Sequence, residues 1–113
     1  MTPKRQPHRP SLPPAKLDEM IKEATVDAYG ESEQVAGFFT LLEERVKLPF
    51  KTEVLGMEVL VERLDLTDDE RIVAVCSRGK SQQPVSILDL TLPDPPPEGA
   101  EWIEAYRRWA RGR

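Results

Sequence analysis

The stretch TVDAYGESEQVAGFF, residues 25–39, separates two segments of helical periodicity. The segment before it predicts a helix over residues 15–28, because its apolar residues recur at i, i+3, i+4, i+7 and i+11: Leu17, Met20, Ile21, Ala24 and Ala28. Gly30 stands where a helix C-terminus favours a residue in the left-handed region, and Ser32 is a residue type that caps a helix start. The stretch therefore predicts the turn of a helical hairpin.

The second helix of this hairpin follows the same apolar spacing. Its predicted buried face consists of Val35, Phe38, Phe39, Leu42 and Val46. The helix must end before Pro49, because the residue ahead of a proline avoids the helical region.

The pattern changes to period two after Pro49, which indicates strands. The run FKTEVLGMEVLVERLDL (50–66) places Val59 and Val61 on one face, with Gly56 as a turn or bulge. Two further runs, RIVAVCSRG (71–79) and QPVSILDLTL (83–92), predict more strands, and Pro84 suggests a sheet edge. Turns are expected at 65–70 and 77–83. These runs predict a small antiparallel sheet, curled or barrel-like.

The final segment, residues 93–113, contains three consecutive prolines and then a predicted helix over residues 99–111. Trp102, Tyr106 and Trp109 form a stripe that we expect to cover the sheet, together with the apolar face of the helical hairpin. The predicted fold class is thus α+β, with an N-terminal helical hairpin, a small antiparallel sheet and a C-terminal helix. Residues 1–14 are expected to be a disordered, basic, proline-rich tail, and residues 15–113 a single domain.

Charge is unevenly distributed along the chain. The net charge is −4, yet residues 1–16 and 107–113 contain four basic residues each and no acid. Residues 17–106 therefore hold all 20 carboxylates against eight basic residues, a net charge of −12. Such a body repels nucleic acid, and bound cations or the two basic ends would relieve its self-repulsion.

Several functional classes are excluded by composition. His8 is the only histidine and Cys76 the only cysteine, so a Ser-His-Asp apparatus and a tetrahedral zinc site are both excluded. No phosphate-binding loop and no membrane-spanning run is present. We therefore expect no enzymatic activity, no specific nucleic acid, no membrane insertion and, from the single cysteine, a cytoplasmic location.

Carboxylates remain as the candidate functional groups, and they form two clusters. Calcium takes six to eight hard oxygen ligands, which acidic side chains beside a turn supply. The first cluster lies around the hairpin turn, with Asp27, Glu31 and Glu33 as candidate ligands and Glu23 as a helper. The second occupies the turn between two strands, with Asp65, Asp68 and Asp69. Neither cluster has the spacing of an EF-hand, since the sixth position from Asp65 is Glu70 where glycine is required.

Three segments resemble the small cyanobacterial calcium-binding proteins of the CcbP type: KLDEMIKEATVDAYGESEQVAGFFTLLEERVKLPFKTEVLGMEV (16–59), DLTDDERIVAVCSRG (65–79) and LPDPPPEGAEWIEAYRRW (92–109). The likeness covers about residues 16–110. It implies an acidic cytosolic protein that binds Ca²⁺ without an EF-hand and buffers or regulates the free ion. The alternative is a metal-free protein-interaction module that uses an exposed sheet edge.

Overall fold

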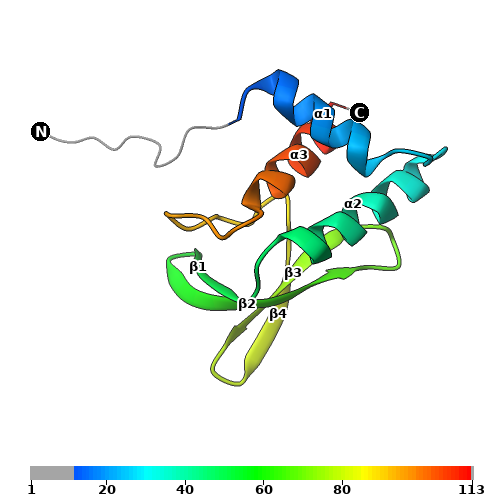
Figure 1. The fold of residues 1–113 in the computed structure, drawn as a ribbon. Helices are drawn as coiled ribbons and strands as arrows, with labels where there is room; N and C mark the ends of the chain where they lie inside the picture. The colour runs from blue at the N-terminus through cyan, green and yellow to red at the C-terminus, as the bar shows by residue number, and fades with distance from the viewer. Residues whose placement is uncertain (1–11, 113) are drawn as a thin grey trace, which may run out of the picture.

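The structure, a computed structural model, describes residues 12–112, which form three helices and one sheet (Figure 1). In chain order the elements are α1 (Pro14–Ala24), α2 (Glu31–Arg45), β1 (Phe50–Val54), β2 (Met57–Leu66), β3 (Ile72–Arg78), β4 (Ser81–Ser86) and α3 (Ala100–Arg111). The predicted α+β class, with its helical hairpin, antiparallel sheet and final helix, is confirmed. Residues 1–11 of the predicted tail lie outside the described part of the chain.

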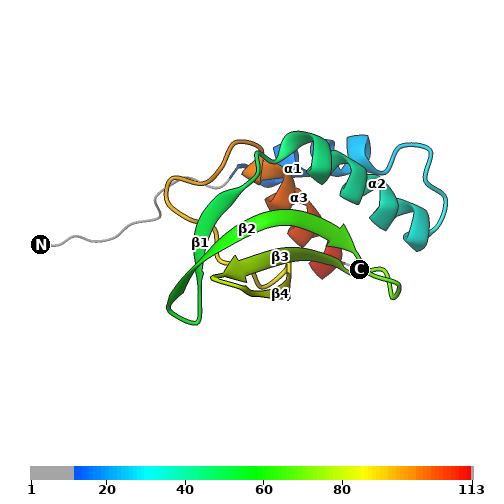
Figure 2. The same cartoon turned by 90° about the horizontal axis from the view of Figure 1, so that it is seen from below.

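The sheet is a four-stranded antiparallel meander in the order β1-β2-β3-β4. It is open and curved rather than a closed barrel, because β1 and β4 remain at its edges (Figure 2). Pro84 pairs with Val75 on the edge strand β4, as predicted. A bulge in β2 between Val61 and Arg63 lets both Val61 and Leu64 face the core.

Two predicted turns are shorter than expected. The expected turn over residues 77–83 shrinks to two residues, because Gly79 with φ of 60° supports a tight hairpin and leaves the polar residues on either side in the ladder. The expected turn over residues 65–70 starts later, since β2 continues through Leu66. Both turn boundaries were inferred from polar residues, and both were misplaced because an exposed strand contains as many polar residues as a loop.

The helices lie on one side of the sheet in a stacked arrangement (Figures 1 and 2). Helix α2 contacts β2, whereas α1 packs chiefly on α3 and α2. The expectation that both hairpin helices cover the sheet is therefore wrong for α1. Its apolar face, with Leu17, Met20 and Ala24 buried, lies against other helices instead.

The aromatic stripe of α3 has a partner that the sequence did not predict, helix α2. The Phe38 ring of α2 lies 5.3 Å from the Tyr106 ring and 5.4 Å from the Trp109 ring, measured between centroids. The Arg45 guanidinium of α2 lies 5.3 Å from the Trp102 ring. These contacts place the stripe against α2, in the same buried cluster as the inner face of the sheet. Periodicity identifies the apolar face of a helix but not the element that covers it.

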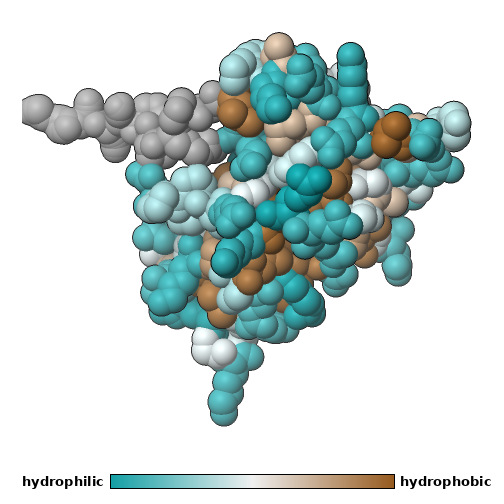
Figure 3. All heavy atoms as spheres, viewed as in Figure 1, coloured by the Kyte–Doolittle hydropathy of each residue, from teal (hydrophilic) through white to brown (hydrophobic). Residues whose placement is uncertain are grey.

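The surface is mostly hydrophilic over the helices in the view of Figure 3, and apolar residues show between the helices and the sheet. None of the helices described between residues 12 and 112 is long and apolar enough to cross a membrane.

Candidate functional site

The turn between α1 and α2 differs in detail from its prediction. Helix α1 ends at Ala24, not at residue 28, because Thr25 leaves helical geometry with φ of −107° and ψ of 11°, and the Ala28 N–H bonds the Thr25 carbonyl at 3.0 Å instead of continuing the helical pattern. The left-handed residue is Asp27, with φ of 62°, whereas Gly30 is extended and serves as the N-cap of α2. Aspartate tolerates this conformation better than most residues. The carboxylate of Asp27 therefore projects from an exposed, non-helical turn.

Glu33 stabilises the start of α2. Its Oε1 accepts a hydrogen bond of 2.9 Å from the Tyr29 N–H, which closes the turn ahead of the helix. Ser32, predicted as the cap, makes no capping hydrogen bond. Glu31 and Glu33 both lie in the first turn of α2, where their negative charges favour the positive end of the helix dipole.

The second acidic cluster forms a turn with internal hydrogen bonds. The Arg71 N–H donates to the Thr67 hydroxyl at 3.0 Å, and that hydroxyl donates to the Asp69 carboxylate. Asp69 also accepts from Arg71 Nε at 3.1 Å. The hydrogen bond from Thr67, reinforced by the charge of Arg71, holds the pKa of Asp69 below its ordinary value. Asp69 is thus committed to ordering its own turn.

Asp65 and Asp68 are less engaged than Asp69. The Asp65 carboxylate accepts a hydrogen bond from the Leu66 N–H at 3.0 Å. Asp68 is exposed and makes no side-chain hydrogen bond or ion pair within residues 12–112. Asp27, on the turn between α1 and α2, is also exposed and makes no side-chain hydrogen bond or ion pair with the described residues. One unengaged carboxylate on each turn is therefore open to a cation.

The two acidic turns meet in space, which the sequence did not predict. The Ser32 hydroxyl donates a hydrogen bond of 2.7 Å to Glu70 Oε2, across 38 residues of sequence. The start of α2 and the β2–β3 turn lie at the same end of the molecule in both ribbon views (Figures 1 and 2). We call this region, comprising residues 27–33 and 65–70, the acidic end.

Glu23 lies apart from the acidic end. Its Oε2 is 3.5 Å from the Arg45 guanidinium, and Arg45 is the last residue of α2, whereas Glu31 is the first. A helix of 15 residues is about 22 Å long at 1.5 Å per residue, so this ion pair directs Glu23 toward the opposite end of α2. The structure thus separates the predicted helper from the other candidate ligands.

The acidic end does not hold a preformed metal cage. Within residues 12–112, no group of three Asp, Glu, His or Cys side chains is close enough together to hold a metal ion. The available donors are nonetheless all oxygens, from carboxylates, a serine hydroxyl and turn carbonyls, which is the donor set that calcium prefers. The chemistry of these residues fits calcium, while the arrangement requires side chains to move toward the ion.

Comparison with known proteins gives one family. No curated protein and no solved structure matched the chain. A family model described as calcium-binding, that of CcbP, matches residues 18–110, which include the whole sheet, all of α2 and most of α1 and α3. The chain therefore belongs to the CcbP family of calcium-binding proteins.

Proposed function

We propose that the acidic end binds Ca²⁺ reversibly, and that the protein acts as a cytosolic calcium buffer or regulator. The observation that supports this is the hydrogen bond between Ser32 and Glu70, because it joins two acidic turns into one region. The carboxylates gathered there are Asp27, Glu31, Glu33, Asp65, Asp68, Asp69 and Glu70. Membership of a calcium-binding family supports the choice of ion.

The side chains divide into two groups by their present contacts. Glu33 and Asp69 stabilise their own turns and would contribute to binding only by leaving those contacts. Asp27 and Asp68 have no such contacts to lose among the described residues. We propose that these two bind first, with Glu31 and Glu70 completing the shell and water filling the remaining positions.

An exposed site that must rearrange binds weakly. Ordering side chains costs roughly 0.5–1.5 kcal/mol for each one immobilised, and exposed charges are screened by salt. We therefore expect dissociation constants between about 1 μM and 1 mM, the range of calcium sensors and of weaker modules. Magnesium should compete poorly, since it requires a tighter octahedral shell. The acidic end has no histidine base or nucleophilic cysteine, and we propose no catalytic activity.

The experiment is calorimetry with calcium on chelator-treated protein, with thermal unfolding in parallel. The test variant carries Asp27→Asn and Asp68→Asn, which remove one carboxylate from each turn. The control carries Glu43→Gln and Glu44→Gln, which remove the same charge from exposed positions in the C-terminal half of α2. Wild type and control should bind and be stabilised, and the test variant should lose both signals. Wild type without heat or thermal shift at millimolar calcium would sink the proposal.

A second candidate function, a protein-interaction module without metal, is supported by a different observation. Leu55 is 96% exposed and Met57 47% exposed at the β1–β2 hairpin, unusual values for large apolar side chains. Under this function, Asp27→Ala with Glu31→Ala leaves stability in calcium unchanged or slightly raised. Under the same function, Leu55→Asp abolishes the capture of a partner protein from calcium-free extract. Equal capture by the wild type and by the Leu55→Asp variant would exclude this role for the hairpin.

A further inference from the structure

The sheet extends beyond the helices at the end that carries its two hairpins, β1–β2 and β3–β4 (Figure 1). A groove of about 230 Å³ lies between these hairpins. Val59, in its lining, lies two positions before Val61 of the core, and side chains alternate along a strand, so Val59 points to the helix-facing side of the sheet. Arg78 follows Cys76 of the core by the same spacing. The groove is therefore the uncovered end of the helix-facing side.

The walls of this groove are apolar and accessible. Leu55 is 96% exposed and Met57 is 47% exposed, and Val54, Val59 and Val85 are half-buried. Single exposed apolar residues are ordinary on a protein surface, whereas several gathered around one groove indicate a surface that a partner covers.

The groove is positively charged, although the protein as a whole is acidic. Arg78 is the one charged residue among the described residues that line it, and it makes no ion pair or side-chain hydrogen bond within residues 12–112. Lys80, at the tip of the β3–β4 hairpin, adds a second positive charge nearby. Glu53 and Glu58 pair with each other across β1 and β2 and, by strand alternation, lie on the outer face. The groove therefore favours an anionic group beside an apolar one.

The size of the groove favours a protein segment over a small molecule. Pockets for small molecules usually measure roughly 300–1,000 Å³, and this groove is smaller, of a size for one large side chain. Leu55 is almost completely exposed, so a ligand confined to the groove would leave most of its surface in water. A segment of a partner protein can fill the groove with one side chain and cover Leu55 with its neighbours.

We propose that this groove binds a segment of a partner protein in which one large apolar side chain lies between carboxylates. The apolar side chain packs against Met57, Val59 and Val85, and a carboxylate binds Arg78, whose guanidinium group can donate two parallel hydrogen bonds to it. This inference rests on the second candidate function and gives it a partner of defined chemistry. It is separate from the calcium site, since the acidic end contains the β2–β3 turn at the other end of the sheet.

The test is an NMR titration of the ¹⁵N-labelled protein, with a calcium chelator present. The probe is a peptide with a central leucine between two glutamates on each side, blocked at both ends. It should cause saturable shifts of the amide signals of Val59, Arg78 and Val85. Two matched peptides carry glutamine for every glutamate or glycine for the leucine. Each should bind at least about tenfold more weakly, because a hydrogen bond to a charged group and a buried leucine each contribute that much.

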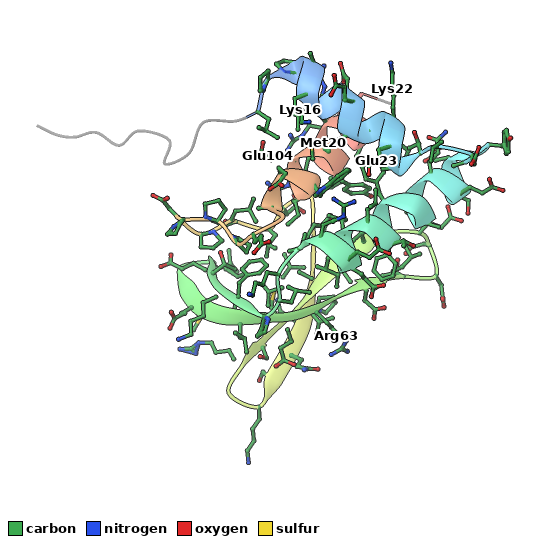
Figure 4. All side chains as sticks on the ribbon, in the orientation of Figure 1. Lys16, Met20, Lys22, Glu23, Arg63 and Glu104 are labelled. Carbon is green, nitrogen blue, oxygen red and sulfur yellow. The ribbon has the colours of Figure 1, made fainter. Side chains whose placement is uncertain are left out.

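Two variants assign the charge recognition to one residue. Arg78→Gln should bind the glutamate peptide no more tightly than the glutamine peptide. The control is Arg63→Gln, which removes another exposed arginine without an ion pair or side-chain hydrogen bond within residues 12–112. Arg63 points away from the helices, on the outer face of the sheet (Figure 4), so this variant should bind like wild type. Both variants should keep the calcium affinity of wild type, so the two proposals fail or succeed separately.

Several results would overturn the proposal. They are the absence of saturable shifts at millimolar glutamate peptide, shifts centred on another surface, and equal binding of the glutamate peptide by wild type and Arg78→Gln. Octanoate, which combines an apolar chain with one carboxylate, is titrated in parallel. If octanoate binds this groove as tightly as the glutamate peptide does, the ligand is a small apolar acid and the assignment to a protein segment is wrong.

Discussion

The Ser32 hydroxyl donates a 2.7 Å hydrogen bond to the Glu70 carboxylate and so joins the start of α2 to the β2–β3 turn. Glu70 has a positive φ of 65°, and its N–H bonds the Thr67 carbonyl at 2.9 Å, so the turn itself fixes where its side chain begins. A single exposed contact of this kind contributes little to global stability. The contact matters for position, because it holds two carboxylate-bearing turns beside each other.

Ser32→Ala should therefore weaken calcium binding more than it weakens the fold. We expect the unfolding free energy to fall by no more than about 1 kcal/mol, because the lost hydrogen bond is exposed. Calcium affinity measured by calorimetry should fall, since the two turns are no longer joined. Ser81→Ala, at an exposed serine of the distant β3–β4 hairpin, is the control. Equal calcium affinity in both variants would show that the Ser32–Glu70 contact does not organise the site.

Gly37 should not tolerate a side chain, although it lies within a helix. A Cβ at this position would lie 2.4 Å from the carbonyl oxygen of Ala24, where the end of α1 lies against α2. Alanine normally stabilises a helix by about 1 kcal/mol relative to glycine. Here overpacking against backbone should reverse the sign, with a net loss of about 1–3 kcal/mol for Gly37→Ala in urea unfolding.

The control for that measurement is Gly30→Ala. A Cβ at Gly30 meets nothing within 4 Å, so only its cap preference changes and the loss should stay below about 1 kcal/mol. Should Gly37→Ala prove as stable as wild type, the close packing of α1 on α2 would be contradicted.

Phe38 should be the most costly aromatic side chain to remove. It is fully buried and contacts the rings of both Tyr106 and Trp109. Phe38→Ala should lower the unfolding free energy by about 3–5 kcal/mol, because it removes buried apolar surface and leaves a cavity. Trp109 fluorescence should also shift in the native state. The half-buried neighbour Phe39, changed to alanine, should cost clearly less. Similar losses at both positions would contradict the assignment of Phe38 to the centre of the helical layer.

Acid stability should depend on the pair formed by Asp18 and Arg108. The hydrogen bond from Arg108 holds the pKa of Asp18 below its ordinary value of 3.8. A carboxyl with a lowered folded-state pKa stabilises the fold above its unfolded pKa, and this contribution disappears as the pH falls through the folded value. Asp18→Asn should therefore be less stable than wild type near neutral pH, and the difference should vanish in strong acid.

Urea midpoints measured between about pH 2 and pH 6 would follow this difference. Glu44→Gln is the control, because it removes an exposed acid that has no partner among the described residues. A constant difference between Asp18→Asn and wild type at every pH would show that the ion pair is not its source.

Local pattern determined the elements of this protein. Apolar spacing identified the buried faces of α1 and α2, as Leu17, Met20, Val35, Phe38 and Leu42 confirm. Period-two and β-branched runs identified the strands, although β4 ends at Ser86 and does not continue to residue 92. Such features depend on residues within a few positions of each other, so the sequence alone is sufficient to predict them.

Tertiary structure decided which surfaces meet. It placed the aromatic stripe of α3 on α2, paired Glu23 with Arg45, and brought Ser32 to Glu70 across 38 residues. The end of α1 also depended on the positive φ of Asp27 and on the hydrogen bond from the Ala28 N–H to the Thr25 carbonyl, which apolar spacing does not register. Periodicity reports which side of an element is buried, whereas the partner it is buried against depends on how all the layers pack together. For this reason the acidic residues were found from the sequence, and their gathering at one end of the molecule was not.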